Sequence, residues 1–90
     1  MTLTDHILDR YFSHKLATLI VDHFTPRCYP DGNFYAIPNP SLHTVSIYCR
    51  DTEVYEFQRE RAFVLLVTFL TRGWEHLDDT VTSNLLKARR

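Results

Sequence analysis

The chain has 90 residues and a mass of 10.7 kDa, which is the length of one domain, so we take residues 1–90 as a single compact domain. Hydrophobic residues make up 44% and charged residues 23%, which are ordinary globular values and exclude a disordered or fibrous chain. Ten basic and eleven acidic side chains give a net charge of −1, which excludes a strongly basic nucleic-acid coat and a strongly acidic DNA mimic.

The first predicted element is a helix over residues 4–24. Apolar side chains recur there at spacings of one, three and four residues, which places them on one face of a helix. They are Ile7, Leu8, Tyr11, Phe12, Leu16, Leu19, Ile20 and Phe24. Pro26 ends the helix, because the residue before a proline is pushed out of the α-helical conformation.

Three short strands are predicted next. Residues 34–37 are rich in strand-forming side chains but are bounded by Pro38, which indicates a short edge strand. Residues 42–49 alternate between two faces and predict a second strand, and residues 54–57 predict a third. The polar break between these two strands predicts that they form an antiparallel hairpin.

Two helices complete the predicted fold. Residues 59–72 carry apolar side chains around almost the whole helix circumference, so this helix should be buried on more than one side. Gly73 marks its end. The last segment carries a one-sided stripe and predicts a third helix: Trp74, Leu77, Val81, Leu85 and Ala88. The expected class is α+β, a helix, a three-stranded antiparallel sheet and two helices, with the helices packed on one sheet face.

The sequence lacks the patterns that carry known catalytic and cofactor chemistry. With Gly32 and Gly73 as the only glycines, it has no glycine-rich phosphate loop. A metal site needs three or four ligands, and no histidine has enough further ligands at the spacing of a known metal motif. His43 and Cys49 share a strand face but stand roughly 20 Å apart, too far for a nucleophile and its base. We therefore expect no catalytic residue, cofactor or metal, and a small enzyme or enzyme subunit is only the third hypothesis.

The expected location is the cytoplasm. The longest apolar run, from Ala62 to Leu70, is far short of the roughly 20 residues that span a bilayer, so we expect no membrane association. The first residues show no secretory signal. Two cysteines are too few for a disulfide-dense secreted scaffold, and both are expected to be reduced thiols.

Aromatic residues are more frequent, at 13%, than one small core can readily enclose. Those in or beside the loops and edge elements are predicted to bind a partner: Tyr29, Phe34, Tyr35, Tyr48 and Trp74. Tyrosine and tryptophan are enriched in protein interfaces, where their large rigid rings bury area. The leading hypothesis is a small protein-binding module, a regulator, adaptor or stoichiometric inhibitor of the kind encoded by phages or plasmids.

The apolar second helix and the stripe on the third predict a homodimer. Exposed apolar patches are rare on monomers, and symmetric dimers are the commonest oligomers. The predicted seam lies on these two helices and includes Trp74, Leu77, Val81 and Leu85.

A nucleic-acid-associated regulator is the alternative function. Basic side chains that could assemble into a phosphate-binding patch are Arg59, Arg61, Lys87, Arg89 and Arg90. Acidic residues lie close to two of them in the chain, at Glu53, Glu56 and Glu60.

Overall fold

The computed structural model describes residues 3–27 and 32–88. The predicted contact residue Tyr29 and the basic residues Arg89 and Arg90 lie outside these ranges. In chain order the elements are α1 (Leu3–Phe24), a 3-10 turn (Thr25–Arg27), β1 (Phe34–Asn39), β2 (Thr44–Cys49), β3 (Thr52–Gln58), a second 3-10 turn (Arg59–Arg61), α2 (Ala62–Arg72) and α3 (Glu75–Ala88). This order confirms the predicted α+β class.

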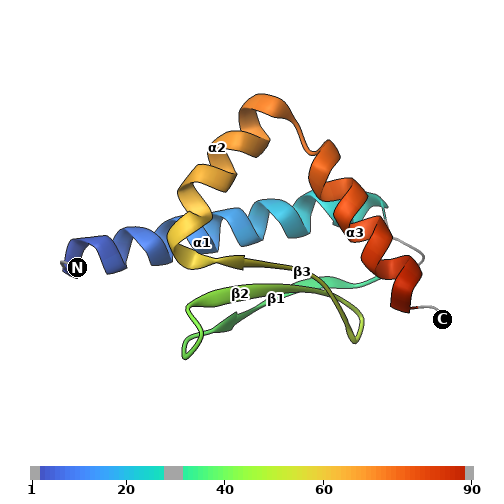
Figure 1. Ribbon diagram of the computed structural model, residues 1–90, viewed down its shortest axis with the longest axis horizontal. Helices are drawn as coiled ribbons and strands as arrows, with labels where there is room; N and C mark the ends of the chain where they lie inside the picture. The colour runs from blue at the N-terminus through green and yellow to red at the C-terminus, as the bar shows by residue number, and fades with distance from the viewer. Residues whose placement is uncertain (1–2, 28–31, 89–90) are drawn as a thin grey trace.

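The three strands form an antiparallel sheet in the order β1-β2-β3, and the three helices lie on one of its faces (Figure 1). α1 runs along the sheet, and its N-terminal turns project beyond the other elements. The Cα radius of gyration is 13.3 Å, slightly above the roughly 12 Å expected of a compact chain of this length. The projecting helix accounts for this extension.

β1 is longer than predicted. We expected it over residues 34–37, but it includes Pro38, which pairs with Val45. The Arg50 amide donates to the Asn33 carbonyl at 3.0 Å, and this bond sets which residues of β1 bond to β2. In that register Pro38 turns its nitrogen toward the outer edge of the sheet, where no ladder bond requires an N–H.

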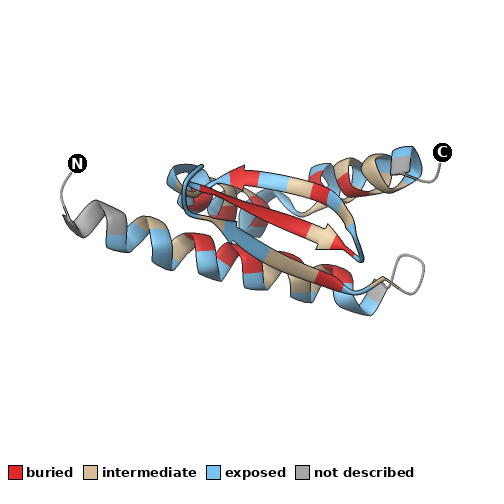
Figure 2. Ribbon diagram, turned by 90° about the horizontal axis from the view of Figure 1, so that it is seen from below, coloured by how far each residue is buried: buried red, intermediate tan, exposed pale blue. Residues whose placement is uncertain are grey.

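The core lies between the sheet and the helices. Its largest fully buried side chains come from α1, from α3 and from the side of the sheet that faces these helices. They are Leu16, Ile20, Phe24, Ile47, Val54, Leu77 and Val81. The central strand β2 is the most buried strand, and in Figure 2 it is red along most of its length. On the open face, Asn39 covers Ser46 by donating a hydrogen bond to its hydroxyl at 2.8 Å.

The burial of α2 differs from the prediction. Only one side of this helix is buried, through Ala62, Leu66 and Phe69. The prediction of burial on more than one side is wrong, because α2 packs on α1 and rises away from the sheet, and α3 turns away from it. The consequence is an exposed apolar stripe, described below.

Gly73 makes the corner between α2 and α3. Its φ is 92° and its ψ is −178°, a conformation that only glycine adopts readily, and its amide donates to the Phe69 carbonyl at 3.0 Å. A Cβ placed on this residue would meet no atom within 4 Å. The need for glycine therefore comes from the backbone alone.

We expect Gly73→Ala to lower the free energy of unfolding by about 1–3 kcal/mol, because alanine pays the backbone strain without gaining or losing a contact. Ser83→Ala, at an exposed position within α3, is the matched control and should change stability by less than about 0.5 kcal/mol. Urea unfolding followed by circular dichroism measures both. Equal effects would show that the corner carries no strain.

Candidate functional site

The structure divides the predicted aromatic surface. Phe34 is only 4% exposed, and its ring stacks on that of Phe24 with centroids 5.2 Å apart. It faces the helices because it stands opposite Cys49, whose side chain is also buried, in the alternating register of β1 and β2. The prediction that Phe34 contacts a partner is therefore wrong: this ring belongs to the core.

Two of the predicted aromatic residues come together on the open face of the sheet. Tyr35 and Tyr48 are directly paired across β1 and β2, and their rings stack at 5.5 Å. The Tyr35 hydroxyl donates to the Arg50 carbonyl at 2.5 Å, which anchors the pair. Both rings are partly exposed, so their role in partner binding stays a prediction.

Trp74 lies on the opposite side of the sheet, in a clasp that ties α3 to α1. Its ring stacks with His23 at 4.7 Å and with Phe69 at 4.9 Å. His23 Nε2 lies 2.8 Å from Asp78 Oδ1, close enough for its N–H to donate to the carboxylate. These contacts give Trp74 a packing role at the corner between α2 and α3.

The predicted dimer seam is also corrected. Leu77 and Val81 are fully buried, so neither can contact a second molecule. Leu85 packs partly buried against the same core. α3 is held over β3, where the Asn84 amide donates to the Val54 carbonyl at 2.6 Å, and the stripe of α3 faces the sheet. The stripe of α3 instead completes the core of one chain by packing over β3.

The exposed apolar surface lies instead on α1 and α2. Its side chains, each between 42% and 63% exposed, are Ile7, Leu8, Tyr11, Phe63, Val64, Val67 and Leu70. We call this set the apolar α1/α2 face. The partly buried Phe12 joins its two halves, since its ring meets Tyr11 at 5.1 Å and Phe63 at 4.8 Å.

The size of this face distinguishes it from scattered surface residues. Aromatic side chains bury roughly 150–250 Å² each and aliphatic ones somewhat less, so half-exposure of the seven residues leaves on the order of 500 Å² uncovered. The largest apolar patch on a typical monomer measures about 300–600 Å² and is often functional. The apolar excess of α2 predicted an exposed surface, but this surface continues onto α1 and not onto α3.

The predicted basic patch is not assembled by the described residues. Arg59 and Arg61 directly follow the last residue of β3, and Arg59 Nη2 contacts His43 Nδ1 at 2.7 Å. Lys87 lies one turn beyond Asn84, which contacts the first part of β3. The length of this strand, roughly 20 Å, separates the two groups.

The partly buried Tyr55 of β3 makes the stability of the fold depend on pH. Burial raises the pKa of the Tyr55 phenol above its ordinary value, and the Arg61 guanidinium opposes this in part. The folded state therefore resists ionisation of Tyr55 more than the unfolded state does. Stability is unaffected by this group well below pH 10 and falls as the pH rises past the ordinary phenol pKa of about 10.

We expect Tyr55→Phe to lose less stability than the natural protein between about pH 8 and pH 11, because phenylalanine has no proton to release. Phenylalanine keeps the ring that packs near Phe57. Urea midpoints at the two pH values give the comparison. The same loss of stability in both proteins would contradict the conclusion that burial raises the pKa of the Tyr55 phenol.

Burial likewise raises the pKa of the Cys49 thiol, and the nearby Arg50 lowers it by less. Within residues 3–27 and 32–88, no group of three or more His, Cys, Asp or Glu side chains is arranged to hold a metal ion. Among the described helices, none combines the length and the apolar character that a membrane crossing requires. Comparisons with protein-family models, curated proteins and solved structures find no match to this chain.

Proposed function

We propose that this chain is a protein-binding module that associates with a second copy of itself through the apolar α1/α2 face. The single observation that carries the proposal is the exposure of seven large apolar side chains on two packed helices, which are joined by the ring contact between Phe12 and Phe63. Water contact with such a surface is unfavourable, and its removal is the main driving force of protein association.

A second copy is the occupant that the area and charge favour. About 500 Å² of apolar surface, enlarged by a polar rim, approaches the roughly 800 Å² that each partner contributes to a standard interface. The net charge of −1 brings almost no repulsion between two copies. In a two-fold dimer the same patch serves both chains, so one exposed face is enough.

The same surface supports a regulatory role as part of this proposal. A cytoplasmic regulator, adaptor or stoichiometric inhibitor needs a fold that presents surfaces to other proteins, and this fold does so on α1 and α2. The Tyr35–Tyr48 pair on the open sheet face offers a second partly exposed aromatic surface to a further partner. Two separate exposed surfaces, the apolar α1/α2 face and the Tyr35–Tyr48 pair, support a module that binds more than one partner.

Light scattering coupled to size-exclusion chromatography tests the dimer with two matched variants. Leu70 lies on the apolar α1/α2 face and is 63% exposed, whereas Leu86 lies outside it on α3 and is 59% exposed. We expect a mass of twice 10.7 kDa for the natural protein and for Leu86→Glu, and 10.7 kDa for Leu70→Glu, at micromolar concentration. A charge buried in the interface is disfavoured, whereas a charge at position 86 stays in water.

Circular dichroism of Leu70→Glu should show that the fold is kept, since the substituted side chain is exposed. A natural protein with a mass near 10.7 kDa would contradict self-association. So would a dimer that Leu70→Glu leaves intact.

A further inference from the structure

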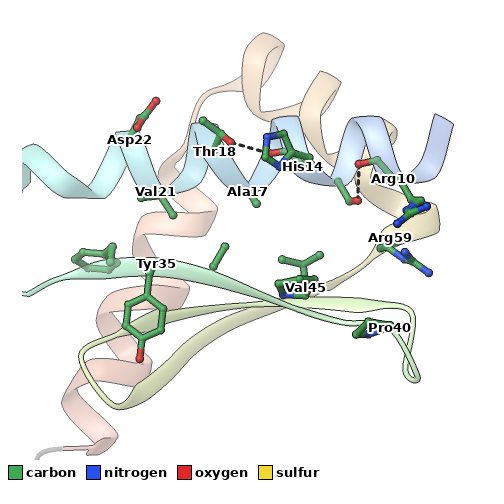
Figure 3. Close-up of a pocket in the computed structure, with 14 residues that line it drawn as sticks. Arg10, His14, Ala17, Thr18, Val21, Asp22, Tyr35, Pro40, Val45 and Arg59 are labelled. Carbon is green, nitrogen blue, oxygen red and sulfur yellow. Dashed lines mark hydrogen bonds between the residues drawn. The ribbon is translucent and has the colours of Figure 1, made fainter. Parts of the chain in front are cut away.

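A groove of about 600 Å³ separates α1 from the edge strand β1, on the side of the fold away from α2 (Figure 3). Its helical wall is one stripe of α1: Arg10, His14, Ala17, Thr18, Val21 and Asp22. Its other wall is β1, with Phe34, Ala36 and Pro38. The volume is typical of a ligand site, and the two walls run side by side, which suits an extended occupant.

The backbone of β1 is ready to pair with such an occupant. Because the Arg50 amide bonds to the Asn33 carbonyl, the residues that bond to β2 are the odd-numbered ones. Phe34 and Ala36 therefore turn their N–H and C=O groups to the outer edge of the sheet, and both residues line the groove. Among the described residues, no side chain or loop forms a hydrogen bond with these backbone groups. An unpaired strand edge of this kind binds another strand readily.

The two ends of the groove carry opposite charges. Arg10 and Arg59 lie at the same end, beside Pro40, and Asp22 lies at the opposite end, as Figure 3 shows. Within the described part of the chain, neither guanidinium forms an ion pair with a carboxylate. The arginine end therefore favours a ligand that brings negative charge.

We propose that the groove binds an extended segment of another protein, which adds as a fourth strand to β1 and places a carboxylate between Arg10 and Arg59. Main-chain hydrogen bonds to Phe34 and Ala36 hold the segment, and the carboxylate sets its register. The carboxylate comes from an acidic side chain or from a chain terminus. This site is separate from the apolar α1/α2 face, so either proposal can fail without the other.

The probes are fluorescein-labelled peptides in which valine alternates with threonine. One carries glutamates at its C-terminal end, a second carries them at its N-terminal end, and a third carries lysines instead; all three are amidated. A fourth has no charged side chain but ends in a free carboxylate. Fluorescence anisotropy should show that at least one carboxylate peptide binds at least tenfold more tightly than the lysine peptide. The strongest binder identifies the source of the carboxylate.

Two protein variants test the two parts of the site. Ala36→Pro removes the N–H that faces the groove and leaves the bonds to β2, so peptide binding should be lost. Arg10→Glu with Arg59→Glu should reverse the preference between glutamate and lysine peptides. The control Arg72→Glu, at the exposed end of α2, should change neither affinity by more than about twofold.

Amide hydrogen exchange gives a readout that does not depend on a variant folding. Peptide binding should slow exchange at Phe34 and Ala36 in the natural protein and leave Tyr35 and Ile37, which already bond to β2, unchanged. No binding of any peptide at millimolar concentration would overturn the proposal. So would binding that survives Ala36→Pro.

A second copy of the chain on β1 is the competing occupant. It would protect the Phe34 and Ala36 amides without peptide, increasingly at higher protein concentration, and that result would overturn the peptide proposal. Repeating the peptide titration with Leu70→Glu keeps this outcome distinct from dimerisation through the apolar α1/α2 face. Unchanged peptide affinity in that variant is the expected result.

Discussion

Replacing Phe34 with alanine is expected to lower the free energy of unfolding by about 3–5 kcal/mol. The ring is 4% exposed and stacks on Phe24, so its removal leaves a cavity between β1 and α1. A domain of this length has a total stability of roughly 5–13 kcal/mol, so this one change removes a large share of it. Urea unfolding at a fixed protein concentration gives the difference.

Tyr35→Ala is the matched control, because Tyr35 is the next residue but faces the open side of the sheet. Its loss removes the stacking with Tyr48 and one hydrogen bond at a partly exposed position, and should cost about 1–2 kcal/mol. If Phe34→Ala costs no more than Tyr35→Ala, Phe34 is a surface residue and the core assignment fails.

These neighbours illustrate what the strand pattern predicts and what it leaves open. Alternation of side chains places Phe34 and Tyr35 on opposite faces of β1 in any register. It does not say which face the helices cover, because both residues are large and aromatic. The side was fixed by the long-range packing of Phe34 on Phe24, a contact between α1 and β1 that no local pattern encodes.

The helices show the same limit. Periodicity correctly predicted that α1 and α3 are helices and that the stripe of α3 forms one apolar face. In α1 the apolar residues do not share one buried face, since Ile7, Leu8 and Tyr11 are exposed while Leu16, Ile20 and Phe24 are buried. α2 is apolar around most of its circumference, and its polar side chains Thr68, Thr71 and Arg72 mark only one side of it as exposed. Only the tertiary arrangement decides that Leu66 and Phe69 face inward and that Phe63 and Leu70 face water. The candidate interface therefore could not be located from the sequence.

The corner at Gly73 explains why both the predicted seam on α3 and the predicted burial of α2 on more than one side are wrong. Its backbone turns α3 back over β3, so that the apolar stripe of α3 is buried in the core. The outer side of α2 stays exposed. The direction of one turn thus decides which helix carries the exposed surface.

The second large effect is expected at α3. Leu77→Ala should lower the free energy of unfolding by about 2–5 kcal/mol, because Leu77 is fully buried and its truncation opens a cavity over β3. Leu86→Ala, the same substitution on the same helix at an exposed position, should cost less than about 1 kcal/mol. Urea midpoints separate a core role from a surface role.

The molecular mass distinguishes this core role from the dimer seam that the sequence predicted. A seam residue would change the mass of the assembly when truncated and leave the folded monomer almost as stable as before. A core residue does the reverse, so Leu77→Ala should keep the mass of the natural protein under conditions where it remains folded. Light scattering under those conditions makes the measurement. If Leu77→Ala instead alters the mass at unchanged monomer stability, α3 is an interface helix after all, and the apolar α1/α2 face loses its claim to be the dimer surface.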